Sequence, residues 1–592
     1  MKSLETLDKG QGKRFGDSPN VMIQNIIIVF LVSLPILSIL GTQLFPFFEN
    51  NPVLLLLISL LALVPVLVAF DKIPKKLYNL AIVIIALSLL YSTSLNSTYL
   101  IGTDIHKEYY FSNLVKTNFY WDSTIASDYN AMLSIVMLAP MCSIVSGMSL
   151  IWVFKIIYPL LFSFTSLILY KVFKSQTDGK TAFLSVFFIT SVFTFYTEMV
   201  GLARQQIGEV VFALLLLLIS DKVMISNFHK KTILMLIFAT ILPMFHYALA
   251  CIFIGLTFFV LFVSYFVRVQ RKTITIPFVI FCCIVTIGWF IYTSRASTFN
   301  IIVKIINHIA STIFTNFLDP QSAQGLHILI TRRKTPLHDI TKTLHLVMQF
   351  FITIGVLVMT LGRVVKKFDE EHHYLSLGSF ILLIAAIAIP YLASALNTTR
   401  LYHISLFLLA PYSVIGWLAI FKTMSKSTAT SFKILSLFLS VFLLFNTGFI
   451  YTIANNDKSI AYPTWAVKNG EAKDWLVLYN AYTPIEEITS AKWLSDHRDG
   501  TLKIYADSNR AFNAYGMIST IEITKLWRIN NEMNEVSYIY LRKLNTINGI
   551  MAVRTTPTGI LFSSTADILF SLSEKTNLIY SGGESIIYVD YI

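Results

Sequence analysis

Long apolar runs separated by short polar segments fill the chain from residue 21 to residue 452. A helix that crosses the bilayer core, about 30 Å thick, needs roughly 20 predominantly apolar residues. The pattern predicts an α-helical polytopic membrane protein of about thirteen spans, near residues 21–41, 53–70, 77–95, 150–173, 181–199, 207–225, 232–247, 249–267, 274–293, 343–362, 375–395, 401–421 and 432–452.

Basic residues predict how these spans are oriented. Lysine and arginine gather in alternate loops, starting with residues 1–20. Cytoplasmic loops carry this excess, so the N-terminus is expected in the cytoplasm and the C-terminal part outside. The apolar segment 131–147 is left out of the count, because a crossing there would move every later basic loop outside. We expect it to be a re-entrant or interfacial helix beside a cavity.

The more polar end of the chain predicts a small α/β domain on the outer face. A helix that ends near His497 comes before four strand-like stretches and a final hairpin, at residues 502–506, 537–541, 549–554, 559–563 and around 581–584. The expected domains are a cytoplasmic N-terminal tail (1–20), a transmembrane domain (21–452) with external loops 96–149 and 294–342, and an extracytoplasmic α/β domain (453–592). The last has no phosphate-loop or nucleophile motif, which favours a structural or substrate-guiding role.

Composition narrows the class of partner. The chain is 55% hydrophobic and 13% charged, with a mean hydropathy of +0.67 and a net charge of +13. The basic residues lie in short loops beside apolar runs, so membrane lipids are expected partners and nucleic acid is not. The four cysteines lie in or beside apolar runs, and their spacing indicates neither a disulfide framework nor a thiolate metal site.

The first external loop holds the leading candidates for chemistry, Asp104 and Glu108. Four residues apart on a helix, the two carboxylates would share one face, as a general base or a divalent cation such as Mg or Mn requires. Alternatively, Asp104 only caps the helix and Glu108 is solvated.

A second polar group lies where two spans meet, at Arg204, Gln205 and Glu209. Glu209 falls inside an apolar run, where an ionisable group is expensive and suggests function, with Arg204 as its expected partner. A buried pair that ties two spans together is the alternative. Arg400, in a short external turn, either extends to the membrane surface or faces a cavity and binds an anion.

The external loop 294–342 is basic on the side where basic residues are not expected. Arg332 and Arg333 could bind a lipid phosphate or pyrophosphate bidentately, although attraction to anionic lipid headgroups would also explain them.

Four stretches resemble a largely archaeal family of predicted membrane proteins: Gly102–Phe111, Tyr129–Ser134, Arg204–Glu209 and Arg400–His403. The layout also resembles the GT-C superfamily of membrane glycosyltransferases, with an acidic residue in an early external loop, many spans and a C-terminal external domain. GT-C enzymes usually carry the acidic loop after the first span. Here it follows the third, which implies two additional N-terminal spans.

The GT-C resemblance implies an inverting transfer of sugar from a polyprenyl-phosphate-linked donor to an extracytoplasmic glycan, lipid or protein. Asp104 would be the base, and Glu108 would hold the acceptor or a cation, although many GT-C enzymes need no metal. The residues expected to bind substrate are Arg204, Gln205, Glu209, Arg332, Arg333, Arg400 and His403. A polysaccharide polymerase, a lipid-linked sugar flippase or another membrane transporter remains the alternative, and a secondary transporter would show inverted repeats.

Overall fold

The computed structural model describes most of the transmembrane part and portions of the C-terminal part. The described residues are 19–44, 51–220, 228–267, 273–320, 322–331, 335–362, 368–392, 396–424, 427–454, 456, 475–476, 479, 483–507, 523–526, 536–556, 559–564 and 576–590.

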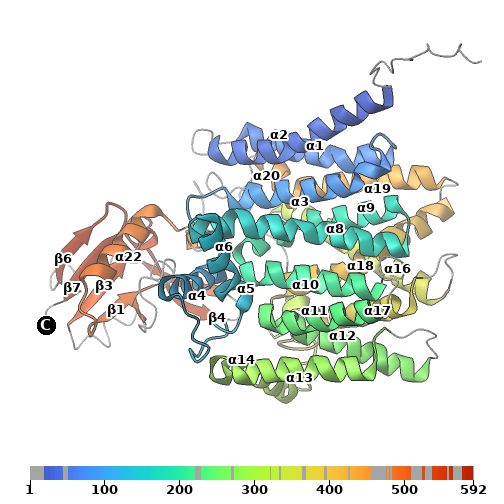
Figure 1. Cartoon of the computed structure of the whole chain (residues 1–592). Coiled ribbons are helices and arrows are strands. Elements are labelled where there is room, and N and C mark those ends of the chain that lie inside the picture. Colours follow the sequence, from blue (N-terminus) through green and yellow to red (C-terminus); the bar gives the residue numbers. More distant parts are fainter. Residues whose placement is uncertain are drawn as a thin grey trace, which may run out of the picture.

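Side-by-side helices make up the larger part of the molecule (Figure 1). Within the described residues, ten helices are long and apolar enough to cross a membrane, or up to twelve if each of two bent pairs is one span. The predicted span at 232–247 coincides with α11, a helix outside this set, so the prediction of thirteen exceeds the upper count by one. The helices are α1 (Pro19–Leu44), α2 (Pro52–Ala69), α3 (Tyr78–Ser94), α7 (Leu150–Trp152), α8 (Tyr158–Gln176), α9 (Gly179–Ser191), α10 (Ala203–Ser220), α11 (Phe228–Phe245), α12 (Tyr247–Phe266), α13 (Ile276–Tyr292), α16 (Pro336–Thr360), α17 (Glu370–Ala388), α18 (Thr398–Met424), α19 (Thr428–Asn446) and α20 (Phe449–Ile453).

Close backbone contact joins α16 and α18. A Cβ atom on Gly355 would lie 1.9 Å from the carbonyl oxygen of Tyr412, and one on Gly416 would lie 2.0 Å from that of Phe351. Since lipid tails are as apolar as leucine, membrane helices associate mainly through such tight packing at small residues. This contact fixes the position of α18, the helix that carries Arg400 and His403.

The segment 131–147 forms two short helices, α5 (Leu133–Val136) and α6 (Leu138–Ser146). At a rise of about 1.5 Å per residue they are together too short to cross the bilayer. They lie with α4 (Asp104–Asn118) at the same end of the bundle as the C-terminal domain (Figure 1), which we call the domain end.

The second predicted external loop is largely helical. It contains α14 (Ser297–Thr312), which turns by 90° from α13, and α15 (Gln324–Ile330). Many apolar side chains on and after α14 are exposed, including Ile306 and Phe314. A helix of this kind, perpendicular to the span before it, fits the surface of a membrane.

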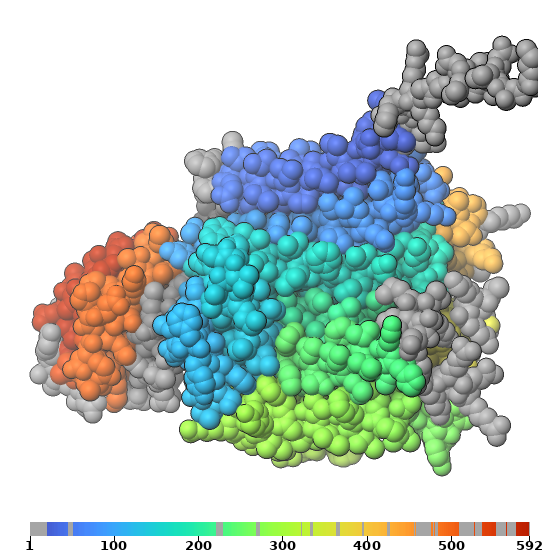
Figure 2. Space-filling model, viewed as in Figure 1, coloured from blue at the N-terminus to red at the C-terminus, as the bar shows by residue number. Residues whose placement is uncertain are grey.

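The C-terminal domain is a separate lobe in Figure 2 and combines a helix with a mixed sheet. Its five-stranded sheet has the order β2-β1-β3-β7-β6, in which β1 pairs in parallel with β2 and β3 and the other pairs are antiparallel. The predicted strands correspond to β1, β3, β4 and β5 and the predicted hairpin to β6–β7, whereas β2 was not predicted. The elements are α22 (Ile485–His497), α25 (Lys543–Thr546), β1 (Lys503–Ala506), β2 (Ile523–Lys525), β3 (Ser537–Leu541), β4 (Ile550–Thr556), β5 (Gly559–Ser564), β6 (Thr576–Ser581) and β7 (Ile586–Asp590).

Candidate functional site

Two glycines let the segment before α4 pack closely against the segment before α10. A Cβ atom on Gly102 would lie 2.6 Å from the Cα atom of Gly201, and Gly102 has a φ of +121°. Both the close contact and the positive φ disfavour any larger side chain at this position. The backbones therefore meet here, and Asp104 comes to lie beside Arg204.

Arg204 is the centre of a charged cluster. Its Nη2 atom lies 3.1 Å from Oδ2 of Asp104, and its Nη1 atom lies 3.3 Å from Oε1 of Glu108. The guanidinium carbon also lies 4.2 Å from the ring centroid of Tyr129, at cation–π distance. Both carboxylates of α4 thus face one guanidinium, because residues four apart share a helix face.

Glu108 is fully buried and accepts a 2.7 Å hydrogen bond from the backbone N–H of Ala203. Burial raises the pKa of Glu108 to about 7, although the adjacent Arg204 opposes this rise. The alternative that Glu108 is solvated is therefore wrong. Its burial favours a role in holding Arg204 over direct contact with a substrate.

Asp104, Glu198 and Arg400 form the accessible part of the cluster. Arg400 lies 3.9 Å from both carboxylates, and the three side chains are 23–25% exposed. Glu198 also accepts hydrogen bonds of 2.8 and 2.9 Å from the hydroxyl of Thr399. At 3.9 Å the pairs of Arg400 are longer than hydrogen bonds, which leaves this guanidinium able to bind another anion.

Glu209 lies deeper in the bundle and pairs with residues other than the predicted one. Its carboxylate accepts a 2.8 Å hydrogen bond from Gln205 and lies 3.0 Å from Nε2 of His403, and Glu209 and His403 have no exposed surface. Gln205 lies four residues before Glu209 and therefore shares its helix face. Arg204 lies five residues before Glu209 and points to another side of the helix, toward α4. The Glu209–His403 pair joins α10 to α18. The sequence left open the alternative of a buried pair that ties two spans together, and the structure shows such a pair with His403 in place of Arg204.

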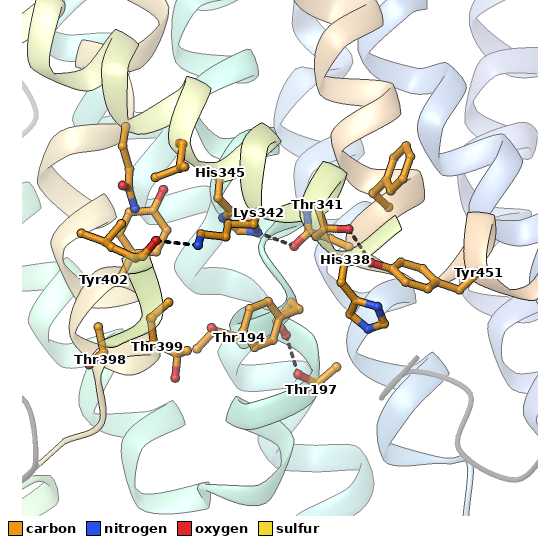
Figure 3. A pocket seen from close by; sticks show the side chains of 17 residues that line it. Thr194, Thr197, His338, Thr341, Lys342, His345, Thr398, Thr399, Tyr402 and Tyr451 are labelled. Atoms are coloured by element: carbon orange, nitrogen blue, oxygen red, sulfur yellow. Dashed lines mark hydrogen bonds between the residues drawn. The ribbon is translucent and has the colours of Figure 1, made fainter. Parts of the chain in front are cut away.

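A pocket of 370 Å³ adjoins the cluster. Figure 3 shows Thr341, Lys342 and His345 on one side of it and Thr194, Thr197, Thr398 and Thr399 on the other. Glu198 belongs to η4 (Thr194–Glu198), a π-helical turn that also carries Thr194 and Thr197. Such turns are frequent at functional sites, and this one brings pocket and charged cluster together.

Not all expected substrate-binding residues can be placed. Arg332 and Arg333 lie outside the described residues. Glu198, Tyr129 and Thr399 were not assigned from the sequence, although Glu198 lies only six residues before Arg204. Within the described part of the chain, no group of three or more His, Cys, Asp or Glu side chains could hold a metal ion. Asp104 and Glu108, the two carboxylates considered for a divalent cation, both face the guanidinium of Arg204, so they do not fit a bound cation.

Comparison with known proteins gives one family match. The family described as "Predicted membrane protein (DUF2206)" matches residues 231–588. No curated protein matches the chain.

Several solved structures are similar at low sequence identity. The Archaeoglobus fulgidus oligosaccharyltransferase AglB in complex with an inhibitory peptide and a dolichol-phosphate is 12% identical, with 83% of this chain and 75% of that chain covered and a TM-score of 0.47. ArnT from Cupriavidus metallidurans bound to undecaprenyl phosphate is 9% identical, covering 87% and 97% with a TM-score of 0.46. The Archaeoglobus fulgidus oligosaccharyltransferase in complex with Zn and sulfate is 14% identical, covering 74% and 61% with a TM-score of 0.42.

Proposed function

We infer that this chain, which belongs to the DUF2206 family of predicted membrane proteins, is a membrane glycosyltransferase. It transfers a sugar from a polyprenyl-phosphate-linked donor to an extracytoplasmic glycan, lipid or protein. The observation that carries the proposal is Asp104, a partly exposed carboxylate beside Arg204 and Arg400, next to a pocket. A base and a phosphate-binding cation at one accessible place are what glycosyl transfer from a lipid phosphate requires.

In the proposed reaction, Asp104 accepts the proton of the acceptor hydroxyl. The acceptor oxygen attacks the anomeric carbon and forms the new glycosidic bond as the bond from that carbon to the phosphate oxygen breaks. The electron pair of the broken bond leaves with the polyprenyl phosphate, whose charge Arg400 stabilises. Attack opposite the leaving phosphate inverts the configuration at the anomeric carbon.

The buried polar residues support this arrangement. Glu108 and the ring of Tyr129 hold Arg204, which in turn orients the Asp104 carboxylate. Gln205, Glu209 and His403 keep α10 and α18 in register, and so set the separation of Arg204 and Arg400. We retain Arg332 and Arg333 as candidate contacts to the donor phosphate.

In this proposal the domain end of the bundle lies on the outer side of the cell membrane, and the N-terminus lies in the cytoplasm. The loop charges support this orientation, because the basic loops alternate with the segments that carry Asp104 and Arg400. In this orientation a donor held in the outer leaflet reaches the site without leaving the membrane.

Proteoliposomes that contain the purified chain and a radiolabelled polyprenyl-phosphate sugar test the proposal. We expect a new glycosidic bond on an added acceptor, with one polyprenyl phosphate released for each sugar transferred. Movement of the labelled lipid between leaflets without any new bond would favour a flippase and contradict the proposal. Vesicles containing the Asp104→Asn variant are the control.

A further inference from the structure

The pocket beside the charged cluster is an apolar cavity with polar groups at selected positions. Its polar lining consists of hydroxyl, amide and imidazole groups and one ammonium group, that of Lys342. Among the described residues that line it, none is aspartate or glutamate. The nearby carboxylate of Glu198 is engaged by Thr399 and Arg400.

Two hydroxyl groups of this lining point to a ligand. Thr194 has no exposed surface, and its Oγ1 atom has no hydrogen-bond partner in the protein. The hydroxyl oxygen of Tyr402 is likewise buried without a partner. Because an unsatisfied buried hydroxyl costs free energy, such groups in a native protein call for a partner. Other polar groups of the pocket are already paired, as His345 is with Asn446 and Thr341 with Tyr451.

We propose that this pocket holds the transferred sugar of the donor and accepts a single sugar unit that carries no amino group. The inference rests on the proposed function, since Thr399 joins the pocket to the cluster that would bind the phosphate. A volume of 370 Å³ is at the small end of ligand pockets, which span about 300–1,000 Å³. A lining with an ammonium and no carboxylate suits a neutral or acidic sugar, because a protonated amine would lie buried without a counter-charge.

Removing the two unpaired hydroxyls tests the pocket. Thr194→Val and Tyr402→Phe preserve shape and should each raise the KM for the sugar-bearing donor by about 3–10-fold, the worth of one hydrogen bond. The inhibition constant of polyprenyl phosphate without a sugar should not change. Thr190→Val is the matched control, because this buried threonine of α9 lies outside the pocket and donates to the carbonyl of Phe187. Equal weakening of the sugar-free lipid would show that the pocket holds the phosphate or the isoprenoid chain, and would overturn the inference.

A donor series tests the sugar class. Equilibrium binding to the Asp104→Asn protein is measured for short-chain polyprenyl phosphates that carry one neutral hexose, one amino sugar or an oligosaccharide. We expect at least tenfold tighter binding of the neutral hexose donor than of the other two, and equal or tighter binding of either would overturn the inference. Since binding is measured without transfer, selective binding with no transfer by the unsubstituted protein would refute the proposed function alone.

Discussion

Of the two arginines in the charged cluster, Arg400 is more available to a donor phosphate than Arg204. Its pairs with Asp104 and Glu198 are both 3.9 Å long and its side chain is 24% exposed. Arg400→Ala should raise the KM for the lipid-phosphate donor by about 10–100-fold, since hydrogen bonds to charged groups are the stronger ones. Kinetics at varied donor concentration measure this effect. Lys304→Ala, an exposed cation on α14, is the control, and an equal rise in that variant would show only a general loss of attraction to lipid.

Glu108 gives the site a pH dependence near neutrality. Burial raises its pKa to about 7, so it is ionised above that pH and shares Arg204 with Asp104. Below it, Glu108 is neutral, so its ion pair with Arg204 is lost and Arg204 is held less firmly beside Asp104. The rate of transfer should therefore fall as the pH is lowered through about 7. Glu108→Gln should lack this step, and pH–rate profiles of identical shape would contradict the assignment.

The sequence predicted the members of the charged cluster better than their pairing. Asp104 was expected in the first external loop, Arg204 where two spans meet and Arg400 in a short external turn, and the structure brings the three together. The burial of Glu108 was not predictable, because it depends on how α4 packs against the start of α10. The partners of Glu209 could have been found, since Gln205 is four residues earlier in the same helix and Arg204 is five.

The contact between the segments before α4 and α10 positions the base. Gly102→Ala would place a Cβ atom 2.6 Å from the Cα atom of Gly201 and force a positive φ on alanine. Unfolding in denaturant should show a loss of about 1–3 kcal/mol, typical of overpacking, and transfer should fall because Asp104 moves relative to Arg204.

A helical glycine with free space around it provides the control for Gly102→Ala. A Cβ atom on Gly255 of α12 would have no heavy atom within 4 Å, so Gly255→Ala should leave both stability and transfer largely intact. If Gly102→Ala behaved like Gly255→Ala, the close contact would not position the base.

Helices and strands were predictable wherever their residue pattern was long and regular. Each predicted span overlaps a helix among the described residues, because about 20 apolar residues suit little else in a membrane. The π-helical turn η4, the 90° turn into α14 and the short strand β2 were missed. These features arise from packing between distant segments, and no periodic pattern in the local sequence predicts them.

The whole chain has a testable orientation in the membrane. In a background with the four native cysteines replaced, Tyr120→Cys and Gly500→Cys should both react with an impermeant maleimide added to intact cells. Both positions are exposed, and the positive-inside bias puts both outside. Lys72→Cys, exposed in a predicted cytoplasmic loop, should react only after permeabilisation. Labelling of positions 120 and 500 from opposite sides would separate the site from the C-terminal domain.

Transfer by the Asp104→Asn variant, measured in proteoliposomes beside the unsubstituted chain, tests the central claim most directly. Asparagine keeps the shape of the side chain but cannot accept the proton, so transfer should fall by about 10²–10⁴-fold while donor binding persists. Asp128→Asn, another acidic residue of the same external loop, should retain transfer. Transfer by Asp104→Asn at the rate of the unsubstituted chain would contradict the assignment of Asp104 as the base.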